Sequence, residues 1–296
     1  MPEVITSPSN PKVKRLLALQ QKSSARREAG LFVVEGRREL QHCIDAGFAV
    51  DSIFYCPSFL ASGSGELPLK TSGDAGPLPL PSEAGPSLLR SRGWLRFSEA
   101  VAASPKEFEV SEEVYAKIAM REGTEGVIAE VRAKERRLDD LALPERPLVV
   151  VLERVEKPGN LGAVLRSADA AGVDAVLLCD PLTDLWNPNL IRASIGAVFT
   201  VPCVACSSAE AIAFLKARGI RILTAQLQDS SLYYDCDMTV GTALVMGTES
   251  TGLTDAWRAA ADAHIRIPML GRLDSLNVSV SAAILLFEAV RQRQNG

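Results

Sequence analysis

The residues with the clearest chemical potential lie in a polar loop near the end of the chain. The loop runs from Pro268 to Asn277, after a predicted apolar strand (His264 to Pro268) and before a long apolar helix. It ends in Ser275, Leu276 and Asn277, and Ser275 is a residue type that commonly caps a helix. A polar loop between a buried strand and a buried helix is typical of a ligand site. A tight strand-to-helix turn without a ligand explains this stretch equally well when it is taken alone.

Two other glycine-containing loops show the same arrangement. The loop from Glu153 to Gly162 contains Asn160 and leads to Arg166 one turn inside a predicted helix. The loop from Gly247 to Leu253 contains Glu249. Each loop follows an apolar strand, and glycines at such places let backbone amides approach a ligand closely. The recurrence at three strand ends favours one shared ligand site.

Each of these loops also has a simpler structural explanation. Gly159 and Gly162 could serve only tight packing between helix and strand, and they form neither GxGxxG nor a P-loop. Asn160 could be an ordinary helix cap, and Arg166 a surface ion pair. Glu249 could be an acidic residue in the first turn of a helix.

The second half of the chain has the pattern of a parallel α/β domain. Apolar strands are predicted at 148–152, 176–178, 221–225 and 242–246, and helices at 160–171, 189–197 and 209–218. Continuous apolar strands that alternate with helices indicate a parallel sheet covered on both faces. Ligands bind such sheets beyond the carboxyl ends of the strands, where we expect the three loops to meet.

The first half is predicted to be a smaller α/β module. A helix from Pro11 is closed by Gly30, and the next predicted elements are a strand (31–34), a helix (36–46) and a strand (50–56). Residues 61–93 are rich in Gly, Pro and Ser and are predicted to be a surface insertion or a disordered loop. A helix from Ser111 and a strand at 126–131 precede a charged linker. We therefore predict a binding domain over 1–140 and a second domain over 141–296.

Basic residues are concentrated near the N-terminus, although the net charge of the chain is −4. The stretch from Lys12 to Glu28 contains many Lys and Arg residues and one acidic residue. Such a stretch suits contacts with phosphates, and a solvated helix face explains it at least as well. The residues predicted to make such contacts are Lys12, Lys14, Arg15, Arg26 and Arg27, together with Arg37 farther along the chain.

Composition narrows the functional classes further. The chain of 296 residues is 47% hydrophobic and 23% charged, as is usual for globular proteins. No apolar run has the length of a membrane helix, and no signal peptide is evident, so we expect a cytoplasmic protein. Six scattered cysteines suit a reducing compartment, and the lone Cys203-Val-Ala-Cys206 is a weak metal signal. With only His42 and His264 as histidines, no metal site is expected.

The three loops, taken together, resemble the motifs of the SpoU (TrmH-like) RNA ribose 2′-O-methyltransferases of the SPOUT superfamily. Asn160-Leu161-Gly162 to Asp169 resembles the first family motif, and Gly247-Thr248-Glu249 to Leu253 the second. Ile267-Pro268-Met269 to Val280 resembles the third, which is highly specific, and Ile191 to Phe199 matches a further family element. The resemblance covers nearly the whole second half. The first half resembles, more loosely, the RNA-binding extension of the family, from which the 61–93 insertion departs.

This resemblance implies a trefoil knot at the carboxyl end of the sheet, with S-adenosylmethionine (AdoMet) bound inside it. The cofactor-binding residues implied by position are Thr224, Gly247, Ile267, Met269 and Leu276. The implied catalytic residues are Arg166, Asn160, Glu249, Ser275 and Asn277.

A homodimer is also implied, and the composition of the final helix supports it independently. This helix is apolar around too much of its circumference for a surface helix. The residues concerned are Val278, Val280, Ile284, Leu285, Leu286 and Val290.

Methyl transfer to a ribose hydroxyl requires alignment and removal of the hydroxyl proton. The family assigns the central role to the arginine that matches Arg166, yet a guanidinium with a pKa above ~12 is a poor base. Either an RNA phosphate helps the proton leave, or Arg166 clamps that phosphate and stabilises the developing alkoxide. Ribosomal RNA is the expected substrate, with transfer RNA as the alternative.

Two functions from other classes also fit parts of the pattern. A nucleotide-dependent oxidoreductase would explain the strand, glycine loop and helix that precede Asp180, but the third glycine of its motif is missing. A non-catalytic RNA-binding protein with the same fold would not require every motif residue to be intact.

Overall fold

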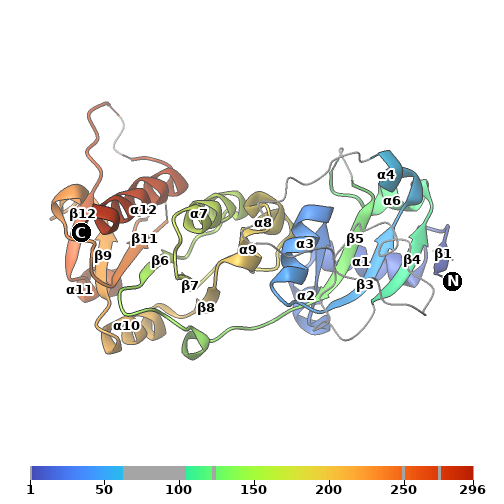
Figure 1. Cartoon of the computed structure of the whole chain (residues 1–296), viewed down its shortest axis with the longest axis horizontal. Coiled ribbons are helices and arrows are strands. Elements are labelled where there is room, and N and C mark those ends of the chain that lie inside the picture. The colour runs from blue at the N-terminus through green and yellow to red at the C-terminus, as the bar shows by residue number, and fades with distance from the viewer. Residues whose placement is uncertain (1, 63–104, 122–124, 249–250, 273–274, 296) are drawn as a thin grey trace, which may run out of the picture. The chain divides into compact units, whose positions relative to one another are not determined.

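The chain folds into two compact α/β units (Figure 1). The computed structural model describes residues 2–62, 105–121, 125–248, 251–272 and 275–295. The N-terminal unit consists of Met1–Gln21 with Val33–Arg132, and the C-terminal unit of Lys22–Phe32 with Ala133–Gly296. Among the described residues, no helix combines the length and the apolar character that crossing a membrane requires.

The N-terminal unit is built on a 5-stranded sheet with the order β1-β4-β3-β5-β2. Its strands are β1 (Glu3–Ile5), β2 (Leu31–Glu35), β3 (Val50–Tyr55), β4 (Lys106–Val110) and β5 (Val127–Arg132). β4 is parallel to β1 and β3, whereas β5 is antiparallel to β3. The helices of this unit include α1 (Pro11–Gln21), α3 (Arg37–Asp45), α4 (Pro57–Ser62) and α6 (Glu112–Ile118). The predicted strands at 31–34, 50–56 and 126–131 are confirmed, while most of the 61–93 stretch lies outside the described residues.

The single helix predicted between Pro11 and Gly30 is instead two helices. α1 ends at Gln21, Lys22 is extended with φ −121°, and α2 (Ser23–Ala29) follows. Serines favour helix N-termini over helix interiors, which explains a new start at this place. Gly30 ends the second helix, as predicted, with a left-handed φ of 61°. α2 belongs to the C-terminal unit.

The C-terminal unit is built on a 7-stranded sheet with the order β10-β12-β9-β11-β6-β7-β8. Every pair of neighbouring strands is parallel, which confirms the predicted α/β class. The strands are β6 (Leu148–Glu153), β7 (Ala175–Cys179), β8 (Cys203–Cys206), β9 (Arg221–Ala225), β10 (Ser231–Leu232), β11 (Thr242–Met246) and β12 (Ala263–Arg266). β6, β7 and β8 lie side by side in the sheet in chain order. β11 lies between β6 and β9, so the strand order reverses beside β6.

Helices cover both faces of this sheet, which explains why its strands are almost wholly apolar. They are α7 (Pro158–Ala170), α8 (Pro188–Ser194), α9 (Ala197–Thr200), α10 (Ser208–Ala217), α11 (Asp255–Ala260) and α12 (Val278–Asn295). α10 and α11 lie on one face and α7 and α12 on the other (Figure 1). Phe214 and Trp257 pack with Val149, Val151 and Leu177 in the core of the first face.

The predicted helix at 189–197 is interrupted in the structure. Ile195 adopts a left-handed conformation with φ 55°, and Gly196 follows with φ 87°. The turn separates α8 from α9, and a glycine at its second position removes the steric cost there. Sequence periodicity alone did not distinguish one helix from two.

Candidate active site

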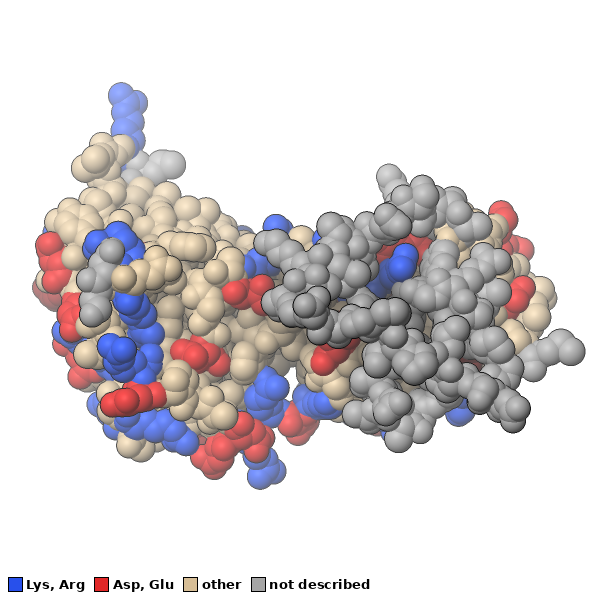
Figure 2. All heavy atoms as spheres, in the orientation of Figure 1, with Lys and Arg blue, Asp and Glu red and all other residues tan. Residues whose placement is uncertain are grey.

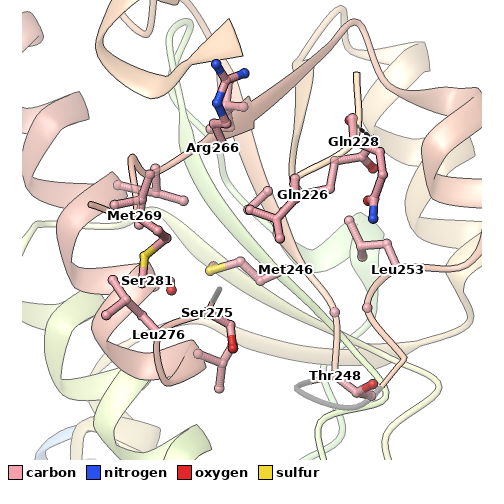
Figure 3. Close-up of a pocket in the computed structure, with 18 of the residues that line it drawn as sticks. Gln226, Gln228, Met246, Thr248, Leu253, Arg266, Met269, Ser275, Leu276 and Ser281 are labelled. Atoms are coloured by element: carbon pink, nitrogen blue, oxygen red, sulfur yellow. Dashed lines mark hydrogen bonds between the residues drawn. The ribbon is translucent and has the colours of Figure 1, made fainter. Parts of the chain in front are cut away.

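A cavity of about 340 Å³ lies beyond the carboxyl ends of β9, β11 and β12 (Figure 3). Its walls come from 225–228 after β9, 246–248 and 251–253 at the end of β11 and after it, and 265–269 at the end of β12 and after it. Arg258 of α11 and the 275–285 stretch that enters α12 complete them. In Figure 3 the side chains of Met246 and Met269 point toward each other across the cavity. The volume is within the usual range for a pocket that holds a small organic ligand.

Five of the predicted site residues line this cavity: Gly247, Ile267, Met269, Ser275 and Leu276. Thr224 does not line it, although the next residue, Ala225, does. The Thr224 side chain is buried and lies 2.6 Å from Nδ1 of His264 on the neighbouring strand. Glu249 lies outside the described residues.

Gly247 is required by the fold of its own loop. A Cβ on Gly247 would lie 2.3 Å from the carbonyl carbon of Gly252 and 2.6 Å from the nitrogen of Leu253. The Gly252 amide also donates to the carbonyl of Thr248 at 3.1 Å, which closes the loop on itself. The glycine therefore permits a close approach of two backbone segments, where the sequence had suggested an approach of backbone to ligand.

Gly162 has a comparable structural role in α7. A Cβ there would lie 2.5 Å from Cβ of Ala193 and 2.8 Å from the Ser194 nitrogen in α8. The sequence suggested tight helix–strand packing as an alternative for this glycine, and the structure shows tight helix–helix packing. No such constraint acts on Gly159, because nothing lies within 4 Å of a Cβ built there.

Asn277 joins the third loop to the first. Its Oδ1 accepts from the amide and hydroxyl of Ser279 at 2.9 and 2.6 Å, and its Nδ2 donates to Oδ1 of Asn160 at 3.2 Å. Asn277 is thus the N-cap of α12, and the assignment of Ser275 as the cap was wrong by two residues. Because both side chains are fixed in this way, the first turn of α7 is held beside the entrance of α12.

Arg166 is exposed on α7 and is not among the residues that line the cavity. It lies six residues after Asn160, or about 9 Å farther along the helix axis. The expectation that all three loops would line one pocket is therefore met by the second and third loops only. The first loop reaches the site through the contact between Asn160 and Asn277.

Gln226 lines the cavity and was not among the residues predicted from the sequence. The Gln226 side chain donates from Nε2 to the carbonyl of Gln228 at 2.9 Å, which fixes the orientation of the amide. Its Oε1 is buried and has no hydrogen-bond partner in the described part of the chain. An acceptor left over at a pocket wall fits a ligand with amino or hydroxyl donors, both of which AdoMet has. Gln226 follows β9, so the rule that ligands bind at strand ends could have indicated it.

The six predicted RNA-binding residues differ in their exposure and in their partners. Lys14 and Arg27 are exposed, and Arg37 at the start of α3 is half-buried. Lys12 is held by Glu3 at 2.5 Å and lies over the Phe108 ring, with Nζ 4.7 Å from the centroid. The Arg15 guanidinium binds the buried carboxylate of Glu130, with 3.1 Å from Nε to Oε1.

Arg26 is removed from the predicted RNA-binding set. Its side chain is only 5% exposed, and its guanidinium binds both carboxylate oxygens of Asp184, at 3.2 and 2.5 Å. A buried, doubly bonded guanidinium cannot reach a phosphate without breaking this pair. The partner lies 158 residues away in sequence, so charge patterning could not reveal it.

Comparison with known proteins identifies the family of the chain. Residues 147–287 match the SpoU rRNA Methylase family, and residues 10–76 match an MRM3-like substrate binding domain. A 23S rRNA (uridine(2479)-2′-O)-methyltransferase from Streptomyces viridochromogenes is 30% identical over 293 residues, covering 97% of this chain and 92% of that protein. The chain belongs to the SpoU rRNA methylase family.

Further members of the family support the same conclusion. A 23S rRNA (guanosine-2′-O-)-methyltransferase from Vibrio vulnificus is 40% identical over 175 residues, covering 57% of this chain and 71% of that protein. The crystal structure of an AdoMet-bound rRNA methyltransferase from Sinorhizobium meliloti superposes with a TM-score of 0.80 at 28% identity, covering 98% of this chain and 97% of that one. The predicted enzyme class, an RNA 2′-O-ribose methyltransferase with AdoMet as cofactor, is confirmed.

Proposed function

We propose that the protein methylates a ribose 2′-hydroxyl of ribosomal RNA at the cavity beyond β9, β11 and β12. The observation that carries this proposal is the junction of the cavity with α7. The walls formed by 246–248, 251–253, 265–269 and 275–276 can enclose a small ligand, and Asn277, which follows the last of these segments, contacts Asn160. Relatives that match the chain are named as 23S rRNA methyltransferases, which favours ribosomal over transfer RNA.

In this proposal the backbone of Gly247, Ile267 and Leu276 holds AdoMet, and Met269 adds an apolar contact. The cofactor supplies a methyl group on a positively charged sulfur. Because the sulfonium is electrophilic, the protein needs only to align the hydroxyl and stabilise the charge that develops on its oxygen. Ser275, Asn160 and Asn277 orient the ribose, and Glu249 belongs to the same proposed set.

Arg166 is proposed to clamp an RNA phosphate next to the reacting hydroxyl. Its exposed position suits a contact with a substrate that arrives from solvent. A guanidinium stays protonated at neutral pH, so it stabilises an alkoxide and a phosphate better than it removes a proton. The proton then leaves to the phosphate or to water.

Four further elements of the proposal extend beyond the cavity. The chain is proposed to form a trefoil knot around the cavity, to act as a homodimer and to work in the cytoplasm. The N-terminal unit is proposed to bind RNA through exposed basic residues such as Lys14. The match of residues 10–76 to a substrate binding domain supports this role.

The experiment that tests the function uses AdoMet with a labelled methyl group and RNA from cells that lack the protein. We expect label in 23S rRNA, resistance of the labelled site to alkaline hydrolysis, and no label in transfer RNA. Label in transfer RNA alone would replace the proposed substrate. Absence of transfer together with binding of NADH in place of AdoMet would favour the oxidoreductase.

A further inference from the structure

A buried carboxylate lies beside the active site and has no part in the chemistry proposed above. Glu153 is the last residue of β6 and is 2% exposed. The next residue, Arg154, has a left-handed φ of 54° and begins the loop that leads to Asn160 and Arg166. Glu153 therefore lies where the first of the three loops leaves the sheet.

Both oxygens of Glu153 are used to hold the end of the second loop. Oε2 accepts from the backbone amide of Thr254 at 2.8 Å, and Oε1 accepts from the Thr254 hydroxyl at 2.7 Å. Thr254 directly follows Gly252 and Leu253, which line the cavity, and it is the N-cap of α11. The Glu153 carboxylate thus fixes Thr254, the residue that directly follows the second loop. Because this loop lines the cavity proposed to bind AdoMet, it is called the cofactor loop below.

The hydroxyl of Ser208 completes the surroundings of this carboxylate. It lies 2.7 Å from Oδ2 of Asp180 and 3.3 Å from Oε1 of Glu153, and it accepts from Nε1 of Trp257 at 3.1 Å. A hydroxyl has one proton, so the shorter contact makes Asp180 its acceptor. Glu153 is consequently held chiefly by Thr254, and the strongest interaction of this buried carboxylate is with the cofactor loop.

We infer that Glu153 is a positioning residue that fixes the cofactor loop relative to the loop that leads to Arg166. Burial of a carboxylate is costly, and a hydrophobic residue of similar volume would serve simple packing as well. A carboxylate that accepts two hydrogen bonds from one residue instead fixes the position of that residue. The inference rests on the proposed function, because it takes the cavity to be the AdoMet site.

The test compares AdoMet affinity, measured by calorimetry, for the wild type, Glu153→Ala and Glu153→Gln. In Glu153→Ala the Thr254 amide loses its acceptor, so we expect AdoMet to bind about tenfold to a hundredfold more weakly. KM for RNA should not change. Glu153→Gln retains a carbonyl acceptor for that amide and should bind AdoMet within about threefold of the wild type. Hydrogen exchange at the Thr254 amide should accelerate in Glu153→Ala and not in Glu153→Gln.

Glu39→Ala provides the matched control. Glu39 is also 2% exposed, and its carboxylate accepts from Arg121 at 2.6 Å in the N-terminal unit. We expect this variant to lose thermal stability and to retain AdoMet affinity. Equal losses of affinity in Glu39→Ala and Glu153→Ala would assign the effect to general destabilisation and overturn the inference.

Thr254→Val decides the question if Glu153→Ala does not fold. Valine removes only the hydroxyl and leaves the amide bond to Oε2, so a rise of about threefold or more in the AdoMet dissociation constant is expected. An unchanged constant would overturn the inference. Failure of the proposed function is recognised separately, because the wild-type protein itself would then neither bind AdoMet nor transfer the methyl group.

Discussion

The hydrogen bond between Asn160 and Asn277 connects residues that are 117 positions apart in sequence. Asn160 lies in the first turn of α7, and Asn277 directly precedes α12, where short polar side chains are common as caps. Asn277 caps α12 through its Oδ1, and its Nδ2 donates to Oδ1 of Asn160. The sequence identified both residues through their motifs, but the contact depends on the tertiary fold.

Replacement of Arg166 separates cofactor binding from transfer. Because Arg166 does not line the cavity, Arg166→Ala should bind AdoMet as the wild type does. Loss of one preorganised positive group should lower kcat roughly 100- to 1,000-fold. The measurements are calorimetry with AdoMet and single-turnover transfer to RNA.

Arg166→Lys serves as the comparison for this variant. Lysine keeps the charge but not the bidentate geometry, so a partial recovery of transfer would support a phosphate clamp. Wild-type turnover in Arg166→Ala would remove Arg166 from the mechanism.

The cysteines of β8 should differ sharply in reactivity. Burial raises the pKa of Cys203 to about 12, whereas a hydrogen bond from the Cys179 thiol lowers the pKa of Cys206. The thiolate is the reactive form, so at pH 8 iodoacetamide should alkylate Cys206 first and Cys203 only after unfolding. Mass spectrometry of peptides from a time course measures both rates, and equal rates in the folded protein would contradict the prediction.

At the scale of elements, the close packing of α7 on α8 depends on the absence of a side chain at Gly162. Gly162→Ala places a Cβ against the backbone and side chain of Ala193, so the helices must separate. We expect a loss of about 1–3 kcal/mol in the free energy of unfolding. Urea unfolding followed by circular dichroism measures it.

Gly159→Ala is the matched control in the same helix. A Cβ at this position meets nothing within 4 Å, so the change should stay within about 1 kcal/mol of the wild type. If both variants lose the same stability, close packing is not what Gly162 provides.

Sequence patterns were sufficient for individual elements and insufficient for their arrangement. Strands β6, β7, β9 and β11 were predictable, because each is a short apolar run bounded by polar or turn residues. The insertion of β11 between β6 and β9 was not, since strand order depends on contacts that local periodicity does not encode. The cap of α12 was misplaced because Ser275 and Asn277 are both good capping residues, and only the fold selects one.

The site shows the same division between local and tertiary information. Gly247, Ile267, Met269, Ser275 and Leu276 were placed at the cavity through motifs that follow strands. Gln226 belongs to no recognised motif, and its contribution depends on an amide whose oxygen remains without a partner. The burial of Arg26 likewise depends on Asp184, which no local pattern links to it.

At the scale of the whole molecule, α12 retains an exposed apolar surface. Val280 is 47% exposed and Phe287 49%, whereas Leu285 and Leu286 are buried within the unit. The apolar circumference noted in the sequence is therefore partly intramolecular packing. The remaining exposed part suits a partner surface in the proposed homodimer.

Light scattering on a sizing column tests the dimer. The wild type should have twice the mass of one chain, and Phe287→Glu should shift it toward the monomer because a buried charge would oppose association. Leu182→Glu, at an apolar residue that is 56% exposed elsewhere in the same unit, should leave the mass unchanged. A wild-type monomer would exclude the dimer.

The segment Lys22–Phe32 limits how the two halves of the chain can be exchanged in chimeric proteins. Arg26 neutralises Asp184, and the Phe32 ring stacks on Trp186 with 4.6 Å between centroids, so eleven residues from the N-terminal half complete the C-terminal unit. The polypeptide thus passes between the units three times, after Gln21, Phe32 and Arg132. A graft that exchanges the first half for another recognition module at a single junction would remove Arg26 and Phe32. Asp184 would then lose its counter-ion, and the indole of Trp186 would lose the ring stacked on it. A viable chimera has to inherit this short patch together with the enzyme.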